Sequence, residues 1–133
     1  MKLSSITLSF FIILIGNYAF SSDIDTELKS CISSNQTTAG MTNCTNKALL
    51  EWDSELNSTY QELRLKLSED ARNSLLNAQR SWIEYKDAEI QNINDIYDSL
   101  EGTMYIPMRA NAILQITKKR TLELKSYLAL VSK

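Results

Sequence analysis

The sequence contains no histidine, a single proline and only three glycines in 133 residues. Without histidine, the Ser-His-Asp and Cys-His arrangements of nucleophilic enzymes are impossible, and the commonest metal ligand is missing. Two cysteines alone do not complete the four-ligand shell of a structural zinc site. There is also no glycine-rich loop of the kind that binds phosphates. The sequence therefore predicts no catalytic residue, no metal and no cofactor.

Paired carboxylates are the one catalytic arrangement that the composition leaves open, because glycoside hydrolysis needs only two acidic side chains. Helix packing would have to bring Asp53 together with Asp87 or Glu89. A small helical protein with so few glycines offers little room for a sugar cleft, so we expect a protein that is not an enzyme.

The N-terminus has the pattern of a signal peptide. Lys2 supplies a positive charge, residues 8–15 form a short apolar segment, and Ser21 is a small residue suited to a cleavage site. The apolar run is far shorter than the roughly 20 residues that span a bilayer, so a retained anchor helix is the weaker alternative. The sequence predicts a signal peptide over residues 1–21, one domain over residues 22–133, and export to the periplasm or out of the cell.

The charge balance is mildly acidic, with 14 lysines and arginines against 16 aspartates and glutamates and a net charge of −2. Cleavage after Ser21 removes one charged residue, Lys2, and leaves a net charge of −3. Nucleic-acid binding usually requires a concentrated basic patch, so we expect no nucleic acid as a partner. The balance is compatible with a cationic protein partner. We expect no membrane span after cleavage, and the oligomeric state stays open.

The rest of the chain predicts an all-α fold. Long stretches without glycine or proline, rich in Leu, Glu, Lys, Gln and Ala, favour helix. Short connections between long helices favour antiparallel neighbours. We expect a small antiparallel bundle of about four helices, one short and three long, with one disulfide. The expected helices cover about 23–33, 41 or 42 to 67, 68–100 and 109–131, with a turn at 34–40 and a loop at 101–108.

Apolar residues spaced three and four apart predict the buried face of each helix. In the first two helices these are Ile24, Leu28 and Cys31, then Leu49, Trp52, Leu56, Tyr60, Leu63 and Leu67. In the third they are Leu75, Ala78, Trp82, Tyr85, Ile93, Ile96 and Leu100. In the fourth they are Ile113, Ile116, Leu124, Tyr127, Leu128 and Val131.

The two cysteines, Cys31 and Cys44, both lie in the predicted exported part. In an oxidising compartment such a pair is more often a disulfide than a metal site. A Cys31–Cys44 bridge would tie the first helix to the start of the second.

Several polar residues lie beside the tryptophans on the predicted helices. One interpretation is a polar binding surface; the favoured one is a buried or half-buried network that fixes the helix register, with Asp53 or Asp87 paired to Arg80 or Arg120. The candidate network is Asp53, Asn57, Gln79, Arg80, Asp87, Thr117 and Arg120.

The predicted loop at 101–108 is rich in Met, Tyr and Ile, where polar residues are expected. Exposed aromatic and methionine side chains often anchor protein recognition. The equally weighted alternative is that they cover the end of the bundle. The candidate partner-binding residues are Glu101, Thr103, Met104 and Tyr105.

Five blocks of sequence together resemble one family. They are Met41-Thr-Asn-Cys44, Trp52-Asp53-Ser-Glu55-Leu56-Asn57-Ser-Thr-Tyr60, Ala78-Gln79-Arg80-Ser-Trp82-Ile-Glu-Tyr85-Lys86-Asp87-Ala-Glu89, Gly102-Thr103-Met104 with Pro107, and Thr117-Lys-Lys-Arg120-Thr-Leu-Glu-Leu124. Over nearly all of the predicted exported part, the chain resembles the LprI family of exported bacterial proteins, named for lysozyme inhibition. The resemblance implies a binding protein that blocks a lysozyme-type muramidase; the alternative is a structural or interaction protein of the cell envelope.

The chain departs from the family pattern in three places. Family members often carry a second cysteine pair, where this sequence has Ile90 and Ala112. Lys86 replaces the usual arginine, and a single glycine, Gly102, stands where two are common. Without the second bridge, packing of the third helix on the fourth has to rely on core contacts.

Overall fold

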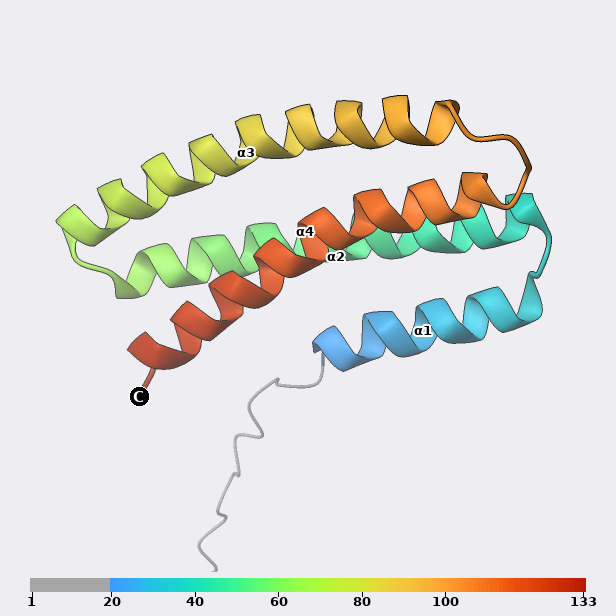
Figure 1. Cartoon of the computed structure of the whole chain (residues 1–133). Helices are drawn as coiled ribbons and strands as arrows, with labels where there is room; N and C mark the ends of the chain where they lie inside the picture. Colours follow the sequence, from blue (N-terminus) through green and yellow to red (C-terminus); the bar gives the residue numbers. More distant parts are fainter. Residues whose placement is uncertain (1–19) are drawn as a thin grey trace, which may run out of the picture.

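The computed structural model describes residues 20–133, and this part consists of four helices joined by short connections (Figure 1). The helices are α1 (Phe20–Ser34), α2 (Thr38–Lys66), α3 (Glu69–Asp98) and α4 (Tyr105–Val131). Within these residues there is no strand, and one disulfide joins Cys31 to Cys44. The predicted all-α class, the number of helices and the disulfide are confirmed. Most of the predicted signal peptide lies outside the described residues, so it stays a prediction.

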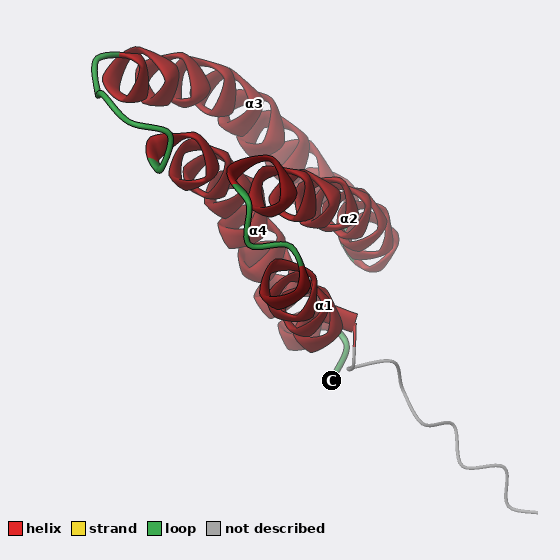
Figure 2. Cartoon of the chain, turned by 90° about the vertical axis from the view of Figure 1, so that its right-hand side faces the viewer, coloured by secondary structure: helices red, strands yellow, loops and turns green. Residues whose placement is uncertain are grey.

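The α2–α4 pair forms the centre of the fold. These two helices make the most extensive contacts of any pair, whereas α1 packs mainly on α2 and α3 more sparsely on α4. In both views α1 and α3 lie on opposite sides of the α2–α4 pair (Figures 1 and 2). The structure is therefore a central pair of long helices with one helix added to each side.

Two apolar clusters hold the helices together. The first joins α1, α2 and α4 through Ile24, Ala48, Trp52 and Leu114. The second joins α2, α3 and α4 through Leu56, Leu63, Leu75 and Leu124. The faces predicted for the first two helices are confirmed, because each listed residue there is buried or half-buried.

Small and β-branched side chains let α2 and α4 approach closely. Thr45 and Thr59 on α2 are buried, as are Thr117 and Thr121 on α4. The fully buried Thr121 hydroxyl lies 2.9 Å from the carbonyl oxygen of Thr117 and 3.3 Å from that of Trp52, so its polar atom is satisfied inside the interface.

Three of the predicted helix starts were wrong, and the first is that of α1, which begins at Phe20 rather than at about Asp23. α2 begins at Thr38 because the Thr37 hydroxyl accepts a hydrogen bond from the backbone N–H of Gly40, at 3.0 Å, and caps the helix. α4 begins at Tyr105 and takes in Pro107, since a first-turn proline lacks only an N–H that has no intrahelical partner. The start of α3 follows the prediction, with Ser68 as the capping residue.

The buried faces predicted for α3 and α4 are partly wrong. Leu75 and Ile93 are buried and Trp82 is half-buried, but the other four residues predicted to face inward on α3 are exposed: Ala78, Tyr85, Ile96 and Leu100. On α4, Tyr127 and Val131 are exposed, whereas Leu114, which the prediction left out, is fully buried. The buried stripe of α3 passes through the polar Gln79, so a search for apolar residues alone places it off centre.

Charged side chains support the attachment of α1. Lys118 on α4 pairs with Asp25 at 2.6 Å, and Lys47 on α2 lies 3.4 Å from Glu27. The hydrogen bond to Glu27 and the negative charge of Glu51 raise the pKa of Lys47 above its ordinary value of 10.5. Because Lys47 and Glu27 are exposed, the disulfide and the apolar contacts of Ile24 contribute more to holding α1 than this pair does.

None of the described helices is both long enough and apolar enough to cross a membrane.

Removal of the disulfide should destabilise the domain. The bridge spans 13 positions, and the chain-entropy model gives about 3 kcal/mol for a loop of this size. We expect the Cys31→Ser/Cys44→Ser variant to lose about 2–5 kcal/mol of unfolding free energy in urea denaturation. A reducing agent should lower the melting temperature of the parent protein and leave that of the variant unchanged. Equal stability of the two proteins would contradict the predicted role of the bridge.

Truncation of the central pair should cost far more than truncation of its outer surface. Leu114→Ala leaves a cavity in the first apolar cluster, and we expect a loss of about 2–5 kcal/mol. Leu130→Ala is the matched control on the same helix, since Leu130 is 64% exposed and should cost less than about 0.5 kcal/mol. Chemical denaturation of both variants measures the difference, and similar losses would refute this account of the core.

Candidate functional site

The connection between α3 and α4 runs over residues 99–104 and is shorter than the loop predicted from the sequence. The Ser99 hydroxyl donates to the carbonyl oxygen of Ile96 at 2.6 Å and closes the end of α3. Gly102 adopts a φ of +119°, which side-chain-bearing residues rarely tolerate. Its carbonyl oxygen accepts from the N–H of Tyr105 at 3.3 Å, so the glycine turn leads directly into α4.

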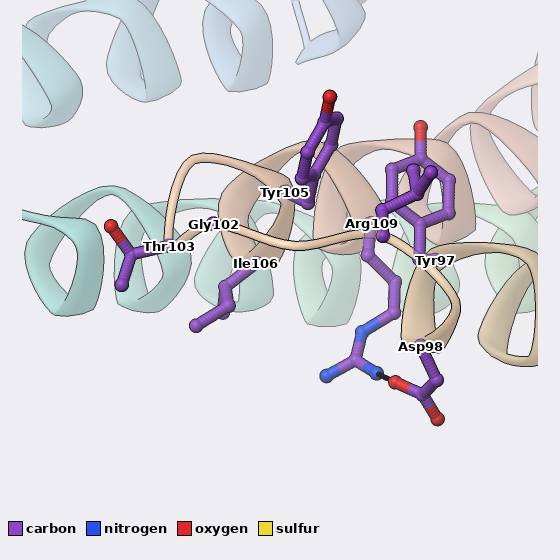
Figure 3. Close-up of a pocket in the computed structure, with 8 residues that line it drawn as sticks. Tyr97, Asp98, Gly102, Thr103, Tyr105, Ile106 and Arg109 are labelled. Carbon is purple, nitrogen blue, oxygen red and sulfur yellow. Dashed lines mark hydrogen bonds and ion pairs between the residues drawn. The ribbon is translucent and has the colours of Figure 1, made fainter.

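A shallow pocket of about 320 Å³ lies at this end of the bundle (Figure 3). The rings of Tyr97 and Tyr105 meet edge to face, with centroids 6.5 Å apart. Arg109 donates to Asp98 at 2.6 Å across the connection. In Figure 3 the two tyrosines point to one side of the loop ribbon and the Arg109–Asp98 pair to the other. These two contacts join the last turn of α3 to the first turns of α4.

The candidate partner-binding residues divide into two groups. Glu101, Thr103 and Met104 are exposed, and Met104 is the most exposed large apolar side chain of this region at 61%. Tyr105 is half-buried because its ring packs against Tyr97. Met104 therefore fits the interpretation as a recognition anchor, whereas Tyr105 fits the alternative in which the side chain covers the end of the bundle.

The structure adds apolar residues to this region that the sequence did not single out for partner binding. We call the exposed set at the α3–α4 connection the end patch: Leu100, Met104, Ile106 and Met108. Met104 is the N-cap residue of α4, and Ile106 and Met108 lie in its first turns, where the sequence predicted a loop.

The candidate polar network is much smaller than predicted. Gln79 and Arg120 are both buried, and Arg120 Nε donates to Gln79 Oε1 at 3.1 Å. Arg120 also pairs with Glu123, which the sequence analysis missed, and Glu123 accepts from the Tyr127 hydroxyl at 3.2 Å. The predicted pairing of Arg120 with Asp53 or Asp87 is wrong.

The other members of that network lie apart from this cluster. Thr117 is buried between α2 and α4, where its carbonyl accepts from Thr121. Asp53, Asn57, Arg80 and Asp87 are all exposed. Exposed polar and charged side chains contribute little to fixing one helix against another, so these four do not form the buried network that the sequence predicted.

Arg120 has one unusual feature. Its side chain is 9% exposed, yet the Nη2 atom has no hydrogen-bond partner within the described residues. A guanidinium carries five N–H donors, and a buried donor without an acceptor costs roughly 1–3 kcal/mol or more when charged. The indole Nε1 of Trp52 is the other buried side-chain donor without a partner among these residues.

The described residues bring no three His, Cys, Asp or Glu side chains together in a way that could hold a metal ion. The described residues present an exposed apolar patch at the α3–α4 connection and a hollow lined by Trp82 and Tyr85 beside Arg120. Fold and site together define a disulfide-linked helical domain with surfaces suited to binding other molecules.

The comparison with protein families identifies the group within this class. The family model described as Lysozyme inhibitor LprI matches residues 31–124, which is most of the chain. The chain therefore belongs to the LprI family, as its sequence blocks indicated. The match includes Cys31 and Cys44 and all three long helices at least in part.

A solved structure shares the fold. The crystal structure of an uncharacterized protein from Burkholderia thailandensis is 28% identical to this chain and superposes with a TM-score of 0.78. The similarity covers 83% of this chain but 55% of the other, so this chain spans little more than half of that protein's length. A comparison with curated proteins gives no match.

The conformation of Gly102 gives a test of the α3–α4 connection. Gly102→Ala places a Cβ on a residue with φ of +119°, and we expect a loss of about 1–3 kcal/mol from backbone strain. Thr103→Ala is the neighbouring control, because Thr103 is exposed and its side chain should contribute less than about 0.5 kcal/mol. Thermal unfolding of both variants checks this. If Gly102→Ala melts with the parent protein, the turn does not need glycine.

Proposed function

We propose that this protein is an exported inhibitor of a lysozyme-type muramidase and that it acts by binding the enzyme rather than by catalysis. The observation that carries the proposal is the match of residues 31–124 to the lysozyme inhibitor LprI family. The exported form would be residues 22–133, released by cleavage after Ser21, with Cys31 and Cys44 oxidised in the periplasm or outside the cell.

The end patch is the surface we propose for contact with the enzyme. Its four apolar side chains are 41–61% exposed and project where α3 turns into α4. Apolar and methionine side chains at the tip of a rigid hairpin can enter a concave partner surface while the backbone that carries them loses little conformational entropy. The Tyr97–Tyr105 contact and the Arg109–Asp98 pair would keep this tip in one conformation.

Charge supports the same arrangement. Glu101 is exposed beside the end patch, and the net charge of the exported form would be −3. Acidic groups around an apolar contact increase the rate of association with a cationic enzyme. We therefore propose Glu101, Thr103 and Met104 as contacts at the rim and tip, with Tyr105 as the residue that supports them.

A titration of lysozyme activity with the oxidised protein tests the proposal. Against several lysozyme types, we expect near-stoichiometric inhibition of at least one. Met104→Glu should raise the half-inhibitory concentration by about tenfold or more, because a charge would be buried at the centre of the contact. Leu65→Ala is the control: Leu65 is 84% exposed at the end of α2, a full α3 length of about 45 Å from the end patch.

Two results would count against this proposal in different ways. Inhibition that survives Met104→Glu would move the contact away from the end patch while keeping the function. Absence of inhibition of every lysozyme type would favour the alternative, a structural or interaction protein of the cell envelope. The exposed Tyr85 and Ile96, which share one side of α3, would then be the first residues to examine.

A further inference from the structure

A second concave surface lies between α3 and α4, separate from the end patch. We call it the α3–α4 groove, and its volume is about 610 Å³. It shares no lining residue with the pocket at the α3–α4 connection. Its apolar part is formed by Trp82, Tyr85, Ile93, Ala112 and Ile116, and its polar part by Glu89, Gln115, Lys119, Arg120 and Glu123.

Arg120 is the charged group that the fold fixes in this groove. Gln79 accepts from its Nε and Glu123 pairs with its Nη1, while Nη2 has no partner among the described residues. Two nitrogens of the guanidinium are therefore occupied, and the third retains N–H donors in a site enclosed from water. A carboxylate is the acceptor whose geometry and charge best match a guanidinium.

The walls of the groove can bind an apolar or aromatic body next to that carboxylate. Trp82 is half-buried and packs against the second apolar cluster, and Tyr85 is 55% exposed. Exposed aromatic rings over isoleucine side chains are suited to stacking with planar or aliphatic groups. Without a ligand in the groove, the ring of Tyr85 is exposed to water. A bound ligand that covers this ring would be stabilised by the apolar surface that it buries.

The charges around the groove favour an anionic group at the Arg120 end. At this end Glu123 carries one negative charge and accepts from the Tyr127 hydroxyl, whereas Arg120 and the exposed Lys119 carry two positive charges. The other acid, Glu89, lies ten residues along α3 from Gln79, the partner of Arg120, and its carboxylate accepts from Asn92 at 3.4 Å.

We propose that the α3–α4 groove is a binding site for a carboxylate attached to an aromatic or aliphatic group, with Arg120 holding the carboxylate and Trp82 and Tyr85 holding the apolar part. Nη2 is enclosed, so the ligand reaches it after a small rotation of the guanidinium, which the half-exposed Glu123 can follow. The proposal goes beyond lysozyme inhibition and does not depend on it.

A carboxylate next to an apolar group occurs in two kinds of ligand. One is a free small acid; the other is the C-terminal carboxylate of a peptide with an apolar last residue. Phenylacetate serves as the probe for the first and N-acetyl-Ala-Ala-Phe with a free C-terminus for the second. Phenylacetamide and the amidated peptide are neutral controls of the same shape.

The experiment is an NMR titration of the oxidised protein, following the indole N–H signals of the two tryptophans and the Nε–H signal of Arg120. We expect phenylacetate to shift the signals of Trp82 and Arg120 saturably and to leave that of Trp52 unchanged, since Trp52 is fully buried outside the groove. Phenylacetamide should bind at least about tenfold more weakly. A peptide that binds about tenfold more tightly than phenylacetate identifies a peptide C-terminus as the source; equal affinity identifies a small acid.

Three variants locate the site. Arg120→Gln should weaken binding by about tenfold or more, and Arg72→Gln, which removes an exposed arginine elsewhere on α3, should not change it. Because Arg120 is buried, its loss can unfold the protein. Tyr85→Ala changes an exposed side chain, so it should keep the parent melting temperature and still weaken binding by about threefold to tenfold.

Several outcomes would overturn the proposal. The first is the absence of saturable shifts with either carboxylate up to about 10 mM, roughly the weakest affinity that a single anchored contact gives. In that case Arg120 serves only to join Gln79 and Glu123. Equal binding of the acid and the amide, or unchanged binding by Tyr85→Ala, would also overturn it. Each of these binding measurements is independent of the lysozyme assay, so neither proposal depends on the result of the other.

Discussion

The close packing of α2 against α4 is the constraint on which the rest of the structure depends. Trp52, Leu114 and Leu124 are completely buried, and the fully buried Thr121 lets the two backbones approach while its hydroxyl reaches carbonyl oxygens on both helices. Both apolar clusters are built on this pair, one on each side of it. Because α1 and α3 contribute few buried residues of their own, their positions follow from where the α2–α4 pair offers an apolar surface.

The two added helices are attached by different means, and this divides the molecule. α1 is short, and a disulfide, an ion pair with α4 and the contacts of Ile24 hold it to the centre. α3 has 30 residues, of which only Leu75, Gln79 and Ile93 are buried, and no second disulfide fixes it at Ile90 and Ala112. A long helix with so few buried contacts leaves surface available along its length. The α3–α4 groove lies along this helix for that reason, and the end patch lies just beyond its last turn, on the connection and the start of α4.

Two of the five sequence blocks that resemble the LprI family meet in space at Arg120. Gln79 and Trp82 belong to one block and Thr117 and Arg120 to another, and the structure places Gln79 against Arg120 with Trp82 lining the same groove. The polar network predicted from the sequence includes both of these buried partners. The prediction was wrong for Asp53, Asn57, Arg80 and Asp87, because residues near a tryptophan in sequence point to different sides of a helix, and each position turns the side chain by about 100°.

Hydrophobic spacing and composition by themselves determined the all-α class, the four helices, the Cys31–Cys44 bridge and the buried faces of α1 and α2, since these depend on local periodicity and on two cysteines that have only each other as partners. Only the tertiary structure decided which face of α3 is buried. The face that packs on the bundle carries the polar Gln79 and Lys86 among its apolar residues, whereas the apolar Tyr85 and Ile96 lie outside it and are exposed. It also decided that Pro107 lies inside α4 and that Arg120 has a buried donor without a partner among residues 20–133. Such features arise from the packing of one helix on another, and a single helix's sequence does not contain its partner's surface.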